Sequence, residues 1–166
     1  MLRQGHASSV DSAALVERLR AWAKELSLSQ IGVAGVDLAA AEPGLAAWLA
    51  AGFHGSMHYM ARHGLKRARP AELVPGTASV ITARMDYLPR DAAPSWIEDE
   101  ASASSNPDRA VISIYARGRD YHKVLRHRLA QLAGRIAAAA GTAGFRAFTD
   151  SAPVLEKALA RDAGLG

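Results

Sequence analysis

The stretch Phe145-Arg146-Ala147-Phe148-Thr149-Asp150-Ser151-Ala152-Pro153-Val154-Leu155-Glu156-Lys157 predicts a strand that is followed at once by a helix. Residues 145–149 form the predicted strand. Pro153 suits the first turn of a helix because its φ is already helical and the first turn does not need its N–H, and Asp150 or Ser151 is then the N-cap. The junction therefore places one carboxylate, that of Asp150, between a strand and a helix.

Toward the N-terminus, predicted helices and strands alternate. The apolar residues Leu15, Leu19, Trp22 and Leu26 share one face of a helix over residues 12–26. A long helix runs from Asp120, its N-cap, to Ala140, and Gly141 ends it. The remaining predicted elements are strands over residues 31–36, 78–87 and 110–115 and helices that begin at Pro43 and Met57. This alternation favours an α/β fold, a layered sheet flanked by helices.

The composition is that of one domain with a real core: 166 residues, 49% hydrophobic and 22% charged. The chain has no cysteine, which excludes disulfides and thiolate-held zinc or iron–sulfur clusters within it. No apolar run is long enough for a membrane span, and no secretion signal is visible, so we expect a cytoplasmic protein with no membrane partner. Residues 1–11 are expected to form a disordered tail. Residues 89–109 are rich in Pro, Ser, Asp and Glu and are expected to form an exposed loop.

Basic residues leave two interpretations open. The formal charge of +4 fits an arginine-rich solvated surface, or a polyanion partner such as RNA. Lys66, Arg67 and Arg69 precede Pro70 in a predicted basic loop, which is either a solvated face or a site that recognises phosphates or amides. No dinucleotide or P-loop fingerprint accompanies them.

A metal site is disfavoured. His54, His58 and His63 lie close in sequence, but the spacing of five between His58 and His63 is poor for one helical face. No carboxylate lies nearby, so packing or surface histidines are the preferred interpretation, and we assign no metal ligands.

Two junctions are candidate sites. The segment Tyr115 to Lys123 (YARGRDYHK) leads into a helix N-terminus, whose free N–H groups suit an anion or a polar ligand. Asp150 is either a capping carboxylate, which favours its ionised form, or a carboxyl buried beside an apolar ligand, which then delivers a proton. The residues alone leave this choice open.

Four blocks in order resemble the epoxyqueuosine reductase family. They are residues 52–63 (GFHGSMHYMARH), 67–76 (RARPAELVPG), 115–123 (YARGRDYHK) and 150–157 (DSAPVLEK), with AGLG at 163–166 after them. The resemblance spans residues 12–166. It implies an enzyme that reduces epoxyqueuosine in tRNA to queuosine, the last step of that pathway, with cobalamin and two 4Fe–4S clusters. It also implies a nitroreductase-like fold, similar to the cobalamin domain of reductive dehalogenases, and an external electron donor.

The resemblance also implies roles for residues. Asp150 matches the family's proton donor. The cobalamin contacts would come from Arg67, Tyr115, Tyr121, His122, Asp150, Ser151 and Ala152, and tRNA contacts from Lys66 and Arg69. Two positions depart from the pattern: Asp86 stands where relatives commonly have Asn, and Ile114 where many have Arg.

Residues 12–166 are then the cobalamin-binding domain, and the family's ferredoxin-like cluster domain, which carries the cysteines, is expected to be absent. Two alternatives remain open: a cobalamin-binding fragment without catalysis of its own, and a basic RNA-binding domain without a cofactor.

Overall fold

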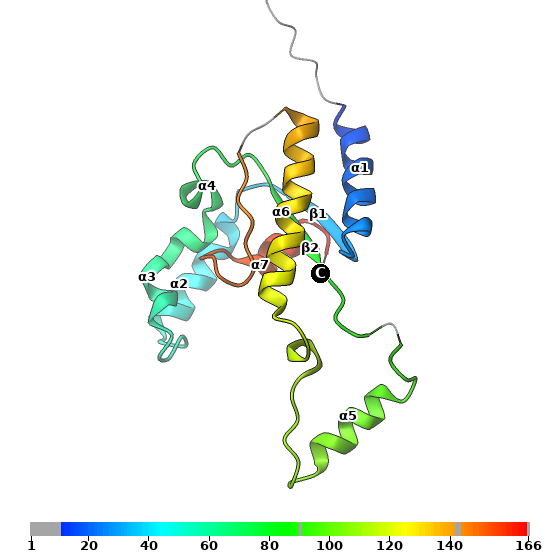
Figure 1. Cartoon of the computed structure of the whole chain (residues 1–166). Coiled ribbons are helices and arrows are strands. Elements are labelled where there is room, and N and C mark those ends of the chain that lie inside the picture. The colour runs from blue at the N-terminus through cyan, green and yellow to red at the C-terminus, as the bar shows by residue number, and fades with distance from the viewer. Residues whose placement is uncertain (1–10, 90, 142–143, 166) are drawn as a thin grey trace, which may run out of the picture.

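The computed structural model describes residues 11–89, 91–141 and 144–165 (Figure 1). The predicted disordered tail therefore lies outside the described residues, except for Asp11. The helices and strands in chain order are α1 (Ser12–Glu25), β1 (Gln30–Ala34), α2 (Glu42–Ala50), α3 (His58–His63), α4 (Pro70–Leu73), β2 (Val80–Arg84), α5 (Trp96–Ser105), α6 (Tyr121–Ala140) and α7 (Glu156–Asp162). Three short 3₁₀ turns join them: η1 (Ala39–Ala41), η2 (Gly64–Ala68) and η3 (Ile114–Ala116).

The two long helices begin and end where the sequence predicts. Asp11 caps α1, because its carboxylate accepts hydrogen bonds from the Ala13 and Ala14 N–H groups. Asp120 caps α6 in the same way and accepts from the N–H of His122. Gly141 ends α6 with a left-handed φ of 65°, a conformation that glycine adopts without steric cost.

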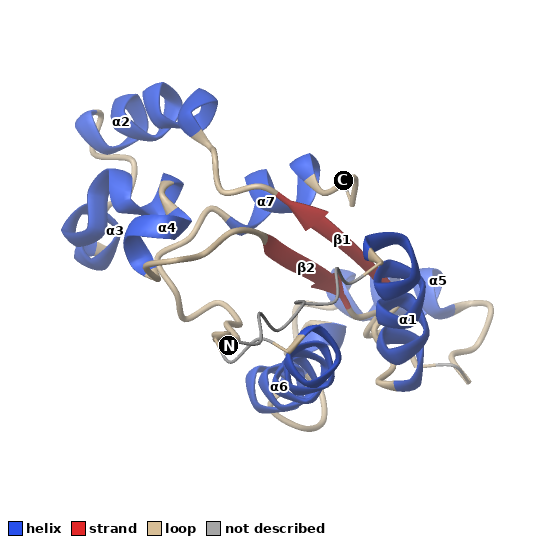
Figure 2. Cartoon of the chain, turned by 90° about the horizontal axis from the view of Figure 1, so that it is seen from above, coloured by secondary structure: helices blue, strands red, loops and turns tan. Residues whose placement is uncertain are grey.

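Within the described residues, the sheet has two antiparallel strands, with helices on both faces (Figure 2). The register pairs Gln30 with Arg84 at one end and Ala34 with Val80 at the other. Because side chains alternate along a strand, Ile31, Ile81 and Ala83 face α1 and α6, whereas Ala34 and Val80 face α7. The predicted α/β class with a sheet between helix layers is therefore confirmed at this coarse level.

Each face of the sheet has its own core. The first core contains Leu19 and Ala23 of α1, Leu28 from the segment after α1, and Leu132 of α6. Leu132 is only 1% exposed. The second core joins Ala34, Leu38, Ala68 of η2 and Leu159 of α7. Because Ala68 and Leu159 share this core, it fixes η2 against α7.

Two predicted strands are wrong. Residues 110–115 and 145–149 make no sheet ladder within the described chain, and residues 114–116 form η3 instead. A strand needs a neighbour to satisfy its N–H and C=O groups, and these segments have none there. Ile112 and Phe145 are accordingly 63% and 53% exposed.

The predicted exposed loop over residues 89–109 is also wrong in part, because it contains α5. Glu98 and Asp99 lie in the first turn of this helix, where the helix dipole favours negative charge. The helix stands on an arm that projects from the layered body (Figure 1). Glu100 holds the arm to the segment before α6 through two hydrogen bonds from Arg117, of 2.8 and 2.7 Å. These bonds lower the pKa of Glu100.

The last helix begins later than predicted. α7 starts at Glu156, and its N-cap, Leu155, makes no side-chain capping bond. Pro153 therefore precedes the helix, and neither Asp150 nor Ser151 caps it. Similarly, the predicted basic loop is partly the 3₁₀ turn η2. None of the described helices is both long and apolar enough to cross a bilayer.

Candidate functional site

Asp150 lies at a bend in the backbone rather than at a helix cap. Its φ is +53°, a left-handed conformation that non-glycine residues seldom adopt, although Asp and Asn tolerate it best. Such conformations cluster at functional sites, because the surrounding structure must hold them. The bend brings the carboxyl to the N-terminus of α6.

Two neighbouring side chains of α6 meet the Asp150 carboxylate. The Tyr121 hydroxyl donates to Asp150 Oδ2 over 2.5 Å, and His122 Nε2 lies 3.6 Å from the same oxygen. The Tyr121 and His122 rings stack, with centroids 4.0 Å apart. Asp120 holds the other ring nitrogen of His122, because Nδ1 lies 3.1 Å from its Oδ1. The capping residue of α6 therefore also orients the histidine that faces Asp150.

Tyr121 is expected to titrate late. The hydrogen bond to Asp150, with some desolvation and the Asp150 charge, raises the pKa of Tyr121 to about 12. Because the folded pKa is raised, this interaction stabilises the fold below pH 10 and is lost as the pH rises through 12. An ultraviolet titration of tyrosinate should show a step near pH 12 that Tyr121→Phe removes. A step that survives in Tyr121→Phe would contradict the assignment.

Asp150 opens onto a cavity of about 460 Å³, which we call the Asp150 cavity. It lies between α3, η2 and the start of α7. Its other lining residues are Tyr59, Met60, Arg67, Ala152, Val154, Leu155, Glu156, Lys157 and Ala158. Ala152 lines it as the sequence predicts, whereas Ser151 is exposed and does not.

Arg67 is the buried cation of this cavity, with 6% of its surface exposed. Its Nη2 donates to the Tyr59 carbonyl over 3.0 Å and its Nε to the Met60 carbonyl over 3.3 Å. The Arg67 carbonyl in turn accepts from the N–H of Leu155 over 3.0 Å. Arg67 thus joins α3 to the segment that follows Asp150, and it leaves a positive charge beside the cavity.

The two other basic candidates lie differently. Lys66 is exposed on η2. Arg69 is held by Glu42, over 2.7 and 3.0 Å, and by Glu72, over 3.2 Å. The hydrogen bonds from Arg69 lower the pKa of Glu42. The structure thus gives Arg69 two carboxylate partners within its own fold.

Glu156 is a site residue that sequence reasoning missed. It lines the Asp150 cavity from the first turn of α7, and withdrawal from water, together with the neighbouring Asp150 charge, raises its pKa. The sequence could have suggested Glu156 as a site residue, because it is the second carboxyl of the DSAPVLEK block and follows Asp150 by six residues. The cavity is therefore lined by two carboxyls, by the ammonium-bearing Lys157 and by one buried guanidinium.

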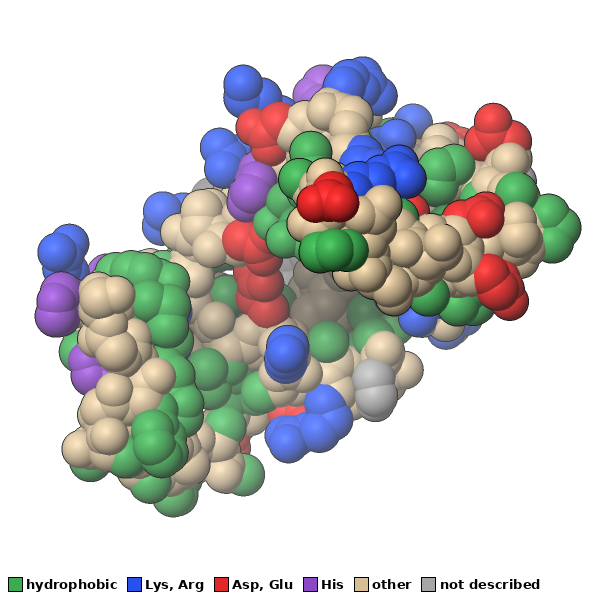
Figure 3. All heavy atoms as spheres, turned by 90° about the horizontal axis from the view of Figure 1, so that it is seen from below, with side chains coloured by type: hydrophobic (Ala, Val, Ile, Leu, Met, Phe, Trp, Pro, Cys, Tyr) green, Lys and Arg blue, Asp and Glu red, His purple; other side chains and the backbone are tan. Residues whose placement is uncertain are grey.

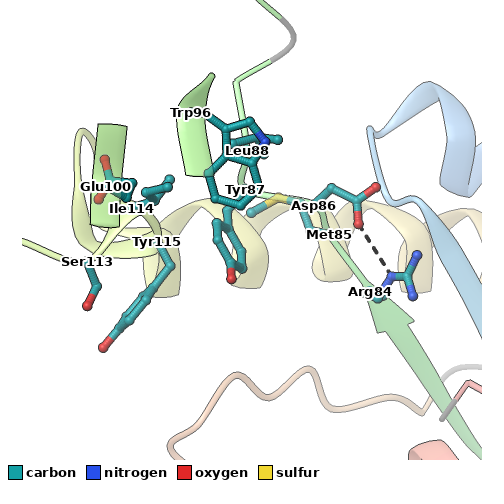
Figure 4. A pocket seen from close by; sticks show the side chains of 10 residues that line it. All are labelled: Arg84, Met85, Asp86, Tyr87, Leu88, Trp96, Glu100, Ser113, Ile114 and Tyr115. Carbon is teal, nitrogen blue, oxygen red and sulfur yellow. Dashed lines mark ion pairs between the residues drawn. The ribbon is translucent and has the colours of Figure 1, made fainter. Parts of the chain in front are cut away.

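A second and more apolar cavity, of about 670 Å³, lies beside Tyr115 between the end of β2, α5 and η3. Figure 4 shows Tyr87, Leu88 and Trp96 grouped on one side of this Tyr115 cavity, with Tyr115 next to Tyr87. Both departures from the family pattern lie here. Asp86 pairs with Arg84 over 3.4 Å, and Ile114 is part of the wall.

A row of rings joins the two cavities. Tyr87 and Tyr115 meet edge to face with centroids 6.3 Å apart, and Tyr115 meets Tyr121 in the same way at 5.8 Å. Tyr121 then contacts Asp150. Of the predicted cofactor residues, the structure therefore brings Tyr115, Tyr121, His122 and Asp150 into one chain of contacts, although only Asp150 of these four lines the Asp150 cavity.

The family model described as "Epoxyqueuosine reductase QueG, DUF1730" matches residues 67–151, about half of the chain. The chain belongs to the epoxyqueuosine reductase family. The matched region begins at Arg67 and ends just after Asp150, so it contains Asp150, its contacts Tyr121 and His122, and the Tyr115 cavity, whereas most of the lining of the Asp150 cavity lies outside it.

Curated relatives agree with this assignment. Proteins named epoxyqueuosine reductase are 66% identical in Alicycliphilus denitrificans, over 95% of this chain, and 56% identical in Burkholderia pseudomallei, over 96%. One in Pseudomonas aeruginosa is 54% identical, also over 96%. The chain spans 44%, 42% and 42% of the lengths of these relatives, respectively. No solved structure matches the chain.

The side chains present fit one of the family's two implied cofactors. The Thr149 hydroxyl, next to Asp150, is buried without a hydrogen-bond partner among the described residues, and the row of rings that ends at Asp150 offers flat apolar faces. The apolar faces, together with the buried guanidinium of Arg67 in the Asp150 cavity, suit a large ring with amide side chains, such as cobalamin. Iron–sulfur clusters do not fit this chain, because it has no cysteine. Among the described residues, no three His, Asp or Glu side chains gather to hold a metal ion.

Proposed function

We propose that this chain is the cobalamin-binding part of an epoxyqueuosine reductase, with Asp150 as the proton donor. The observation that carries the proposal is the Asp150 carboxyl, held in a left-handed bend against Tyr121 and open to a cavity, in a chain of this family. The proposed domain spans residues 12–166. Its two-faced layered sheet is consistent with a nitroreductase-like fold of the reductive-dehalogenase type.

The reaction assigned to Asp150 is proton delivery. Converting an epoxide into an alkene takes up two electrons and two protons and releases one water. When the C–O bond opens, negative charge develops on the oxygen, and a carboxylic acid within hydrogen-bond reach protonates it. Tyr121 and His122 position the Asp150 carboxyl, because both lie against its Oδ2. The Glu156 carboxyl, whose pKa is raised, lines the same cavity as Asp150.

The residues proposed to hold cobalamin are Arg67, Tyr115, Tyr121, His122, Asp150, Ser151 and Ala152. These residues would hold a cofactor that would supply the electrons for the reduction. The rings of Tyr115 and Tyr121 offer apolar faces beside Asp150, and they exclude water from it when covered. Arg67 adds positive charge, which suits a phosphate or amide oxygens. Because this chain contributes no thiolates, we propose that the electrons come from an external donor.

The proposed substrate is tRNA that carries the queuosine-type base, which places the reaction in the cytoplasm. Lys66 and Arg69 are the proposed phosphate contacts. Lys66 is exposed and can contact a phosphate without any rearrangement. The Arg69 guanidinium is already paired with Glu42 and Glu72, so a phosphate would have to compete with these carboxylates. We therefore assign the larger share of this contact to Lys66.

Cobalamin binding tests the proposal directly. Adding cob(II)alamin to the chain should shift the visible corrin spectrum, because the ligand moves from water into a site formed by the Asp150 cavity and the row of aromatic rings. Tyr115→Ala should weaken binding about tenfold, since it removes the ring that joins the two cavities. Ile97→Ala is the matched control: Ile97 is 58% exposed on α5 but lines neither cavity.

The outcomes separate three functions. A spectral shift followed by reduction of epoxyqueuosine tRNA with a chemical reductant supports the reductase. A shift without turnover indicates a cobalamin-binding module that does not catalyse. The absence of cysteine from this chain favours that alternative, because the chain then holds no iron–sulfur cluster to supply electrons. Binding of tRNA with no corrin shift indicates an RNA-binding domain and contradicts the cobalamin proposal.

A further inference from the structure

A long acid-free segment surrounds α3. Residues 43–71, which we call the α3 lobe, contain no Asp or Glu, although they carry four Lys or Arg residues and three histidines. Arg67 is buried and Arg69 is paired with carboxylates outside the lobe. Arg62 and Lys66 are exposed, and neither forms an ion pair within the described residues. The lobe therefore presents uncompensated positive charge.

The same lobe exposes large apolar side chains. Phe53 is 69% exposed, Tyr59 55% and Met57 41%, all within seven residues of the chain. The lobe on the left of Figure 3 shows hydrophobic side chains gathered beside histidines and a basic side chain. Apolar surface of this kind on a monomer marks a binding site, and its basic surroundings select an anionic partner.

The two aromatic rings stand on a fixed backbone. The Tyr59 carbonyl accepts from the buried Arg67, whose guanidinium also lies 5.9 Å from the centre of the Tyr59 ring. The N–H of Phe53 donates to the Trp48 carbonyl over 3.3 Å, and the next residue, His54, packs its ring on Trp48 with centroids 6.1 Å apart. Rings presented by a fixed backbone lose little conformational entropy on binding.

Tyr59 connects this surface with the candidate site, because it also lines the Asp150 cavity. We propose that the α3 lobe binds an unpaired segment of RNA, with Phe53 and Tyr59 stacked on bases and Arg62 and Lys66 against phosphates. This inference rests on the proposed function, which requires a base of a tRNA loop to leave its stack and reach Asp150. Unpaired bases stack on exposed aromatic rings, and base stacking tolerates any sequence.

Two RNA probes test the lobe: a labelled stem-loop with an unpaired loop, and a fully paired duplex of the same length. Fluorescence anisotropy should show that the chain prefers the stem-loop. Phe53→Ala and Tyr59→Ala should each weaken stem-loop binding about tenfold and leave duplex binding unchanged. Phe145→Ala, which removes a ring that is 53% exposed outside the lobe, should leave both unchanged.

The cations give a separate readout. Replacing Arg62 and Lys66 together by alanine should weaken binding of both probes and lower the slope of log affinity against log salt by about 1.4, or about 0.7 for each lost phosphate contact on a single strand. The double change Lys24→Ala and Arg126→Ala, which removes two exposed cations elsewhere, should keep the slope. Circular dichroism of each variant checks that it is folded.

Two results would overturn the inference: aromatic variants that bind the stem-loop as the unaltered chain does, or equal losses on stem-loop and duplex. The first would leave the apolar surface to a protein partner. Phe53 lines neither cavity, so Phe53→Ala should keep the corrin shift. If the lobe variants bind RNA as the unaltered chain does and also keep the corrin shift, only the proposed RNA site on the α3 lobe is refuted. If the unaltered chain itself shows no corrin shift, the proposed function is refuted.

Discussion

Asp150→Asn should reduce epoxide turnover by about 100- to 10,000-fold, the usual contribution of a general acid. The amide keeps the size of the side chain and an oxygen that accepts from Tyr121, but it carries no proton to deliver. Asparagine also tolerates the left-handed φ of +53°, so the backbone should remain as it is. The measurement is single-turnover reduction of substrate tRNA by the cobalamin-loaded chain with a chemical reductant.

Binding distinguishes lost chemistry from a lost site. Asp150→Asn should retain the corrin spectral shift, because the row of rings and Arg67 are untouched. Asp108→Asn provides the matched control, since Asp108 is exposed and lies in neither cavity. A rate for Asp150→Asn equal to that of the control would refute the role of Asp150 as an acid.

Gly32→Ala should lower the free energy of unfolding by about 3 kcal/mol, the upper part of the range for an overpacked core. A Cβ at Gly32 would lie 2.8 Å from the Cβ of Ala163 and closer still to its carbonyl oxygen. The obstacle is backbone at the end of α7, so it cannot rotate away as a flexible side chain would. We expect α7 to shift, and the corrin shift to weaken with it, because α7 carries Glu156 and follows Asp150.

Gly134→Ala is the opposite case and the control for this prediction. Gly134 lies inside α6 with no atom within 4 Å of an added Cβ, so alanine should stabilise the chain by about 0.5–1 kcal/mol through better helix propensity. Urea unfolding with unchanged m-values measures both effects. Equal stabilities for the two variants would show that α7 does not pack on β1 as described.

The sequence predicted the elements whose signals are local. Asp120 caps α6 and Gly141 ends it, and apolar residues at helical spacing line the buried faces of α1 and α6. Both true strands were also predicted, because residues 31–36 and 78–87 are short apolar runs between turn signals. Family blocks in the sequence further pointed to Asp150, Tyr121 and His122, which the structure brings into contact.

The errors occurred where the outcome depends on distant partners. Residues 110–115 and 145–149 have strand-like sequences, but pairing requires a neighbouring strand, and the described chain offers them none. α5 was missed because its polar composition resembles a loop, although Arg117, far along the chain, anchors Glu100. The role of Glu156 was hidden for the same reason, since its environment depends on how α7 packs beside Asp150.

The junction around Asp150 shows where sequence and tertiary structure divide. The sequence by itself determined the family, the α/β class and the identity of the carboxyl, because these follow from motif, periodicity and residue type. Only the tertiary structure decided that Asp150 is no helix cap, that Tyr121 and His122 hold it, and that Arg67 and Glu156 share its cavity. Those contacts join residues far apart in the chain, and only the packing of η2, α6 and α7 brings them together.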